Sequence, residues 1–144
     1  MQVINEMKMV IDALSINEGY CRVAVATFVA QLDPTIDELN DIKTSVSEAV
    51  TNCIVHAYPK KKGKIYITVR LYADGLARVI IKDKGIGIED IKKAREPLFT
   101  TAGGERSGLG FSVMESFSDR LLVRSKPGRG TSITLEKRIV GKGK

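Results

Sequence analysis

Hydrophobic and polar residues follow two periods along the first third of the chain, one typical of strands and one of helices. Apolar and polar residues alternate from Met7 to Leu14, which predicts a strand. Apolar residues then recur at helical spacing from Tyr20 to Leu32 and predict a first helix, with Ser15 or Asn17 as its N-cap. This helix should end before Pro34, because the residue preceding a proline is pushed out of the α region.

A second and longer helix is predicted from Thr35 to Tyr58. Thr35 and Glu38 have the spacing of a capping box, and no Gly or Pro occurs before Pro59. At about 100° per residue this helix divides into two faces. The apolar face, expected in the core, holds Leu39, Ile42, Val46, Ala49, Val50, Cys53 and Ala57. The polar face holds Asp41, Ser45, Glu48, Asn52 and His56.

The second half of the chain predicts two hairpins separated by a glycine-rich connection. The strands of these hairpins are expected at Ile65 to Tyr72, Leu76 to Lys82, Arg120 to Ser125 and Thr131 to Arg138. Six of the 13 glycines lie between Asp83 and Gly110, which is typical of a functional loop or lid. Short helices are predicted at Glu89 to Arg95 and at Gly108 to Phe117.

Hairpins that alternate with helices indicate an α/β fold. We expect a two-layer sandwich in which a mixed, mostly antiparallel sheet carries its helices on one face. The chain has 144 residues, 43% of them hydrophobic, enough for one domain over residues 1–144 with one continuous core. The basic tail, at about residues 138–144, is expected to be solvated and frayed.

Composition excludes several classes of protein. Cys21 and Cys53 fit neither a disulfide framework nor a zinc site, so they are interpreted as buried apolar side chains. A single histidine, His56, cannot build a multi-histidine metal centre. The uncharged apolar stretch from Val23 to Leu32 is too short to span a bilayer, and Met1 to Leu14 lacks a signal-peptide pattern, so a cytoplasmic location is expected. The net charge of +6 permits acidic partners without choosing among them.

Three segments carry candidate chemistry. Glu48, Asn52 and His56 are spaced i, i+4 and i+8, which puts three polar side chains in one row, either as a solvated helix face or as a site. The segment Asp83-Lys84-Gly85-Ile86-Gly87 follows a strand, and its glycines would let the backbone approach a flat ligand. The segment Gly108-Leu109-Gly110 opens a helix after Arg106, which suits phosphate oxygens.

The order of these segments resembles a known family. Glu48 to Asn52, Asp83-x-Gly85-x-Gly87 and Gly108-x-Gly110 resemble the three nucleotide-binding boxes of the Bergerat-type ATPase fold shared by gyrase, Hsp90, histidine kinases and MutL. More closely, three segments resemble the anti-sigma F factors of endospore-forming bacteria, a family of serine-protein kinases: Val46 to Asn52, Pro97 to Thr101 and Glu105 to Phe111. The resemblance extends from about Asn5 to Leu135, with Gln31 to Thr35 supporting it outside the nucleotide site.

The resemblance implies a role for each candidate residue. Glu48 would be the general base, Asn52 would bind Mg²⁺, and Asp83 would accept a hydrogen bond from the adenine amino group of ATP. Gly85 and Gly87 would allow close backbone approach, and Thr131 would help to hold the base. The lid over the phosphates would be formed by Thr100, Thr101, Arg106, Gly108 and Gly110.

The resemblance also implies the partners. The chain would act as a homodimer that binds sigma F and keeps it from RNA polymerase, and it would phosphorylate a serine of a small anti-anti-sigma protein, controlling sporulation transcription. Arg22 matches a position that contacts both partners; without the resemblance it would be interpreted as a solvated arginine. Neither direct nucleic-acid binding nor membrane binding is implied.

Three alternatives stay open. The chain could be an anti-sigma B-type kinase of the stress response, which the nucleotide motifs do not separate from the sporulation branch. It could also be a nucleotide-gated sigma-binding module without kinase turnover, although Glu48 is present. A nucleic-acid-binding module would need basic residues interleaved with aromatic ones, and the four phenylalanines do not pair with the Lys60 to Lys64 cluster.

Overall fold

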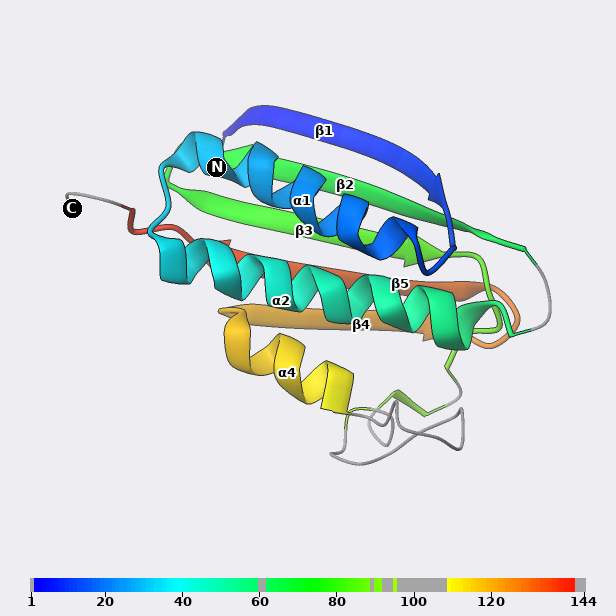
Figure 1. Cartoon of the computed structure of the whole chain (residues 1–144). Coiled ribbons are helices and arrows are strands. Elements are labelled where there is room, and N and C mark those ends of the chain that lie inside the picture. Colours follow the sequence, from blue (N-terminus) through cyan, green and yellow to red (C-terminus); the bar gives the residue numbers. More distant parts are fainter. Residues whose placement is uncertain (1, 60–61, 89, 92–94, 96–108, 142–144) are drawn as a thin grey trace.

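The computed structural model describes residues 2–59, 62–88, 90–91, 95 and 109–141. In this part of the chain, one sheet of five strands in the order β1-β2-β3-β5-β4 carries three α-helices on one face (Figure 1). The elements are β1 (Val3–Asp12), α1 (Asn17–Val29), α2 (Ile36–Asn52), β2 (Lys64–Tyr72), β3 (Leu76–Asp83), α4 (Leu109–Phe117), β4 (Arg120–Lys126) and β5 (Gly130–Arg138). The expected two-layer α/β sandwich is confirmed. The sheet, expected to be mixed, is antiparallel at all four described pairings.

The N-terminal elements differ from the predictions at their ends. β1 runs from Val3 to Asp12, earlier than the predicted strand, because it pairs along the whole of β2. α1 begins at Asn17, with Ile16 at the N-cap and no side-chain cap. Both predicted N-caps are therefore wrong, and the Asn17 side chain instead donates to the Asp12 carbonyl (2.9 Å). After α1 a short 3-10 helix, Ala30–Leu32, completes the predicted first helix.

The central helix, α2, lies between α1 and α4 and packs against both (Figure 1). Its predicted capping box is confirmed: Thr35 Oγ1 accepts from Glu38 N (3.1 Å), and Glu38 Oε1 accepts from Thr35 N (2.9 Å). The predicted apolar face is buried except for Leu39, which is half-buried. Ser45 was predicted on the polar face but is buried, since α4 covers it, and its Oγ lies 3.3 Å from Ser118 Oγ.

The structure also bears on the predictions for the two cysteines, for the helix at Glu89 to Arg95 and for membrane spans. Both cysteines are buried free thiols, as interpreted, and burial raises the pKa of Cys21 to about 11 and that of Cys53 well above its ordinary value. Of the helix predicted at Glu89 to Arg95, Arg95 N donates to the Ile91 carbonyl (3.0 Å), while residues 89 and 92–94 lie outside the described residues. No described helix is long and apolar enough to cross a membrane.

The C-terminal tail is held at the start of α2 and is not frayed as far as Gly141. Ile139 is buried in the core, and the Glu38 carboxylate accepts from the N–H groups of Val140 (2.8 Å) and Gly141 (3.1 Å). Partial burial raises the pKa of Glu38, but the backbone N–H groups of Thr35, Val140 and Gly141 outweigh it, so the pKa lies below the usual value. One carboxylate thus caps α2 and anchors the tail.

Replacing Glu38 with alanine should lower the free energy of unfolding by about 1–2 kcal/mol at neutral pH, because a cap and two tail contacts are lost together. The pKa of Glu38 is lower in the folded chain than the ordinary 4.5, so its stabilisation is present above that pH and is lost as the pH falls through the folded pKa. Urea unfolding at neutral and acidic pH tests this. Asp37→Ala, which removes the exposed acid of the same helical turn, is the control. A Glu38→Ala effect no larger than the control, or one that persists in acid, would contradict the prediction.

Candidate nucleotide-binding site

Asp83 is the buried polar group at the end of β3. Its Oδ1 accepts from Gly85 N (3.0 Å) and Thr131 N (3.2 Å), and its Oδ2 lies 3.7 Å from the Cys53 thiol. Burial raises the pKa of Asp83, and the two backbone N–H groups partly oppose that shift. The Asp-x-Gly spacing explains the turn, because an Asp carboxylate readily accepts from the N–H two residues later. Oδ2, with one weak thiol donor, keeps acceptor capacity for a further donor.

The loop after Asp83 passes so close to its neighbours that it needs glycine. A Cβ at Gly85 would overlap the carbonyl oxygen of Ala57, and one at Gly87, where φ is +77°, would overlap the carbonyl oxygen of Lys126. Ile86 N donates to the same Ala57 carbonyl (2.9 Å). The glycines therefore let the loop pack against Ala57 at the end of the long helix and against Lys126 on β4. The close approach of this backbone to a flat ligand stays a prediction.

The end of the long helix is irregular in a way that the sequence did not predict. α2 stops at Asn52, short of Tyr58, and continues as a π-helical turn, Cys53–Ala57. The Tyr58 hydroxyl then accepts from Lys84 N (2.7 Å) and donates to the Lys64 carbonyl (2.8 Å). π-Helical turns are frequent at functional sites, and this one places Cys53 against Asp83 and fixes the glycine loop.

A hydroxyl pair closes the same end of the pocket. Ser125 Oγ accepts from Ile88 N (2.8 Å), donates to the Gly130 carbonyl (2.9 Å) and lies 2.8 Å from Thr131 Oγ1. Because Ser125 has a single proton, which goes to Gly130, Thr131 must be the donor to Ser125. The Thr131 oxygen then keeps lone pairs with which it can accept from a ligand.

Glu48 and Asn52 meet α4 at Gly110. A Cβ built on Gly110 would lie 3.2 Å from Glu48 Oε2 and 3.4 Å from Asn52 Oδ1. Both oxygens therefore converge near one point at the start of α4, on the surface of α2 that the spacing predicted. A carboxylate and an amide oxygen suit Mg²⁺, which takes most of its remaining ligands from phosphates and water.

Comparison with known proteins decides the family. Residues 15–137 match the model of the histidine kinase-like ATPase domain. The chain is 53% identical over 137 residues to the anti-sigma F factors of Geobacillus sp. (strain WCH70) and Bacillus subtilis (strain 168), covering 94% of this chain and 93% of each relative. This chain belongs to the anti-sigma F factor family. The histidine kinase-like ATPase domain implies that the chain binds ATP and has a kinase-like ATPase activity.

Solved structures share the fold of this family member. A structure of the RsbU and RsbW domains of a Mycobacterium tuberculosis protein aligns with a TM-score of 0.69 at 20% identity, over 94% of this chain and 32% of that one. The histidine kinase domain of an Erythrobacter litoralis blue-light activated histidine kinase aligns with a TM-score of 0.58 at 19% identity, over 85% of this chain and 61% of that one. This chain thus spans about a third of the first structure and somewhat less than two thirds of the second, and both support the fold alone.

The remaining predicted site residues divide into two groups. Thr100, Thr101, Arg106 and Gly108 lie outside the described residues. Arg22 lies on α1, 3.7 Å from Glu18, and lines a surface groove with Asn40, Lys43, Thr44, Ser47 and Glu48. The groove therefore joins Arg22 to Glu48, the predicted general base, although 26 positions separate the two residues in the chain.

Replacing Gly85 with alanine should lower the free energy of unfolding by about 1–3 kcal/mol and weaken ATP binding, because the added methyl would force the loop away from Ala57. Urea unfolding and calorimetric titration with ATP measure the two effects. Gly19→Ala is a matched control: on the α1 helix its Cβ would meet only Arg22 Nη2 at 3.6 Å, so stability should rise by up to ~1 kcal/mol. Equal stability of the Gly85 variant and the native chain would contradict the packing described here.

Proposed function

We propose that this chain is a protein serine kinase that transfers the γ-phosphate of Mg²⁺-ATP to an anti-anti-sigma protein, and an anti-sigma factor that binds sigma F and blocks its use by RNA polymerase. One observation carries the proposal: Cys53 contacts Asp83 and directly follows Asn52 in the chain. This contact supports one continuous site in which Asp83 would bind the adenine and Asn52 would act at the phosphates. The relatives' name, anti-sigma F factor, supports the sigma F part.

The adenine end would be formed by Asp83 and Thr131. Asp83 Oδ2 would accept from the adenine amino group, while Oδ1 is kept in place by its two backbone donors. Gly85 and Gly87 let the loop pack against the carbonyl oxygens of Ala57 and Lys126, and this packing would hold the loop in place beside a flat base. The Thr131 hydroxyl donates its proton to Ser125. Its oxygen would therefore accept a hydrogen bond from the edge of the adenine ring.

The phosphate end would be formed by Glu48, Asn52 and Gly110. Asn52 Oδ1 would hold Mg²⁺, which when bound supplies positive charge that offsets the charge of the phosphates. Glu48 would accept the proton of the attacking serine hydroxyl as the new bond from the serine oxygen to the γ-phosphorus forms and the bond from that phosphorus to ADP breaks. Thr100, Thr101, Arg106 and Gly108 remain proposed lid residues on the strength of the family resemblance.

The phosphate acceptor would approach along the groove that joins Arg22 to Glu48. Lys43 and Arg22 give this groove a positive lining next to the proposed base, and Asn40, Thr44 and Ser47 add polar groups. Such a lining favours a protein segment that brings hydroxyl and carboxylate groups. We therefore keep Arg22 as the proposed contact for both protein partners.

A homodimer is proposed as the working form of the protein, in the cytoplasm. β1 is an edge strand of the sheet, and the side chains of Ile4 (56% exposed) and Val10 (58% exposed) lie open on it. Exposed edge strands pair readily with a second chain. Sedimentation of the native chain and of Ile4→Asp tests this, and a native monomer at micromolar concentration would contradict the dimer.

The proposed function is tested by mixing the chain with Mg²⁺ and γ-labelled ATP in an extract of its own organism, followed by mass spectrometry of the labelled protein. We expect the native chain to label a serine of one small protein. With the Arg22→Ala variant, labelling of that protein should not exceed background. Release of free phosphate alone would indicate an ATPase without this acceptor. A labelled stress-response partner would favour the anti-sigma B alternative, and sigma binding without any label would favour the nucleotide-gated module.

A further inference from the structure

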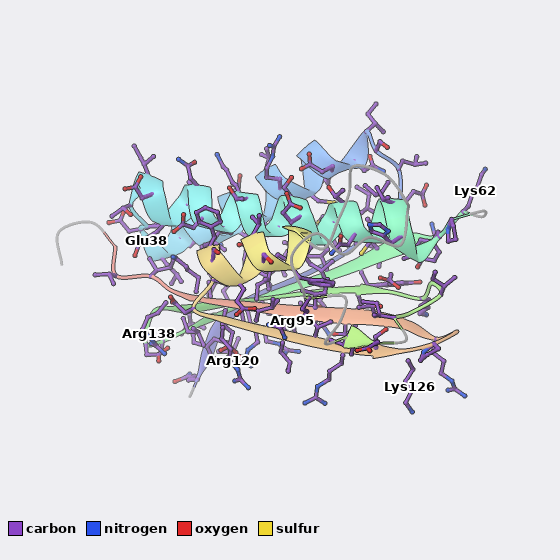
Figure 2. All side chains as sticks on the ribbon, turned by 90° about the horizontal axis from the view of Figure 1, so that it is seen from below. Glu38, Lys62, Arg95, Arg120, Lys126 and Arg138 are labelled. Atoms are coloured by element: carbon purple, nitrogen blue, oxygen red, sulfur yellow. The ribbon has the colours of Figure 1, made fainter. Side chains whose placement is uncertain are left out.

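The face of the sheet that the helices leave open is strongly basic at one end. Side chains tipped with nitrogen project from this face, Lys126 among them (Figure 2). Cross-strand pairing puts Tyr66, Lys82, Ser132 and Arg124 in one row across β2, β3, β5 and β4. Lys82 precedes buried Asp83, and Arg124 follows buried Val123, so strand alternation turns both toward the open face.

Four residues form what we call the basic patch: Lys82, Lys84, Arg124 and Lys126. All four are exposed, and none makes an ion pair with a described residue. Arg124 and Lys126 are two residues apart on β4, or about 7 Å, and Lys82 is two strands away, or about 10 Å. The patch therefore concentrates uncompensated positive charge within a small area behind the Asp83 pocket.

The other end of the same face is neutralised by the chain itself. Arg70 is paired with Glu6 (2.6 Å), and Arg78 with Glu136 (2.7 Å). A hollow over this ion-paired end is lined by the apolar side chains of Ile80 and Leu122 together with Arg70, Arg78, Arg120, Thr134 and Glu136. Ile80 and Leu122 lie on either side of Thr134 in a row across β3, β5 and β4, which we call the apolar row, directly beside the row of Lys82 and Arg124.

We propose that the open face docks an amphipathic acidic segment of a partner protein, with carboxylates on the basic patch and apolar side chains over Ile80 and Leu122. Adjacent rows on a strand face are about 7 Å apart, close to the 5–6 Å that separates helix residues at i and i+4. A helix with acidic and apolar residues at that spacing would match both rows. Charge complementarity supplies the attraction, and the apolar row supplies orientation.

Two other occupants fit the face less well. The homodimer is proposed at the β1 edge, where Val10 pairs with Tyr66 at the far end of this row. A second copy seated instead over Lys82 and Arg124 in a two-fold contact would place basic patch against basic patch. A single-stranded nucleic acid would need rings on which successive bases stack. Tyr66 is the half-buried ring of the basic row, and the Lys84 ammonium already lies 4.8 Å from its centroid. Tyr72 is buried beneath Arg78.

The test is a fluorescence-anisotropy titration with three labelled probes at 0.15 M salt, with ATP present so that the nucleotide pocket is filled. The probes are a helical 15-residue peptide with Glu and Leu at i and i+4, the same peptide with Gln for Glu, and an oligothymidylate of 15 nucleotides. The chain variants are K82E/R124E and the control K60E/K62E, which changes the net charge by the same amount. Circular dichroism verifies that each variant is folded.

We expect saturable binding of the acidic peptide, weakened at least tenfold in K82E/R124E and changed less than twofold in K60E/K62E. The Gln peptide should bind at least tenfold more weakly than the Glu peptide. Equal loss in both variants, equal binding of the two peptides or no saturable peptide binding would overturn the proposal. If the oligonucleotide bound more tightly than the acidic peptide and K82E/R124E removed that binding, the proposal would be overturned in favour of nucleic acid. None of these outcomes depends on phosphate transfer, so the proposed kinase activity stands or fails separately.

Discussion

Glu48→Ala should reduce phosphate transfer by about 10²–10⁴-fold while leaving the affinity for ATP within about threefold of the native chain. The change removes the proposed general base but none of the groups proposed to bind adenine. Glu48 projects from α2 toward Gly110 at the start of α4, and the described hydrogen bonds of Asp83 go to Gly85, Thr131 and Cys53. The loss should therefore appear in the rate of transfer at saturating ATP. Single-turnover transfer of γ-labelled phosphate to the partner, with ATP affinity from calorimetry, measures both quantities.

Two variants control the Glu48 result. Glu48→Gln keeps the volume and an oxygen near Gly110 but cannot take up the proton, so it should behave like Glu48→Ala in transfer. Asp37→Ala removes an exposed carboxylate from the first turn of the same helix and should transfer at the native rate. Transfer by Glu48→Ala at the native rate would show that another group accepts the proton. A parallel loss of ATP binding would show that Glu48 acts mainly in binding.

Asp83→Ala should weaken ATP binding by about 10–100-fold, because it removes the proposed acceptor for the adenine amino group and leaves the N–H groups of Gly85 and Thr131 without their partner. The preference for ATP over a nucleotide without the amino group should fall as well. Asp83→Asn should have a smaller effect on stability, since an amide oxygen in place of Oδ1 can still accept from both backbone donors. Calorimetric titrations with ATP and inosine triphosphate measure affinity and preference.

A stability measurement separates binding from folding in the Asp83 variants. Burial raises the pKa of Asp83, so its charge is costly in the fold, and part of the lost hydrogen bonding should be offset when the carboxylate is removed. A folded Asp83→Ala chain with weakened ATP binding supports the adenine role. A folded variant that binds ATP and inosine triphosphate as the native chain does would contradict it.

Local patterns predicted the parts of the site that depend on neighbours in sequence. The capping box at Thr35 and the helical period placed Glu48 and Asn52 one turn apart on α2. The end of a predicted strand and an Asp-x-Gly turn placed Asp83 and Gly85. These features could be read from the chain because each needs only residues within a few positions.

Contacts between distant segments could not be predicted in the same way. Ser125 joins Ile88 to Thr131, and the Tyr58 hydroxyl joins Lys84 to Lys64, through side chains whose partners are set by strand pairing. The π-helical turn after Asn52 breaks the helical period without any Gly or Pro as a signal. The basic patch could not be predicted from the sequence either, because Lys82 and Arg124 become neighbours only through β5.

We propose that one site holds the whole nucleotide, with the adenine at Asp83 and the phosphates at Glu48 and Asn52. A crystal structure of the chain with Mg²⁺ and a non-hydrolysable ATP analogue tests it most directly. We predict the adenine amino group within hydrogen-bonding distance of Asp83 Oδ2 and Mg²⁺ coordinated by Asn52 Oδ1. An analogue bound elsewhere, or in the pocket with its base away from Asp83, would contradict the claim.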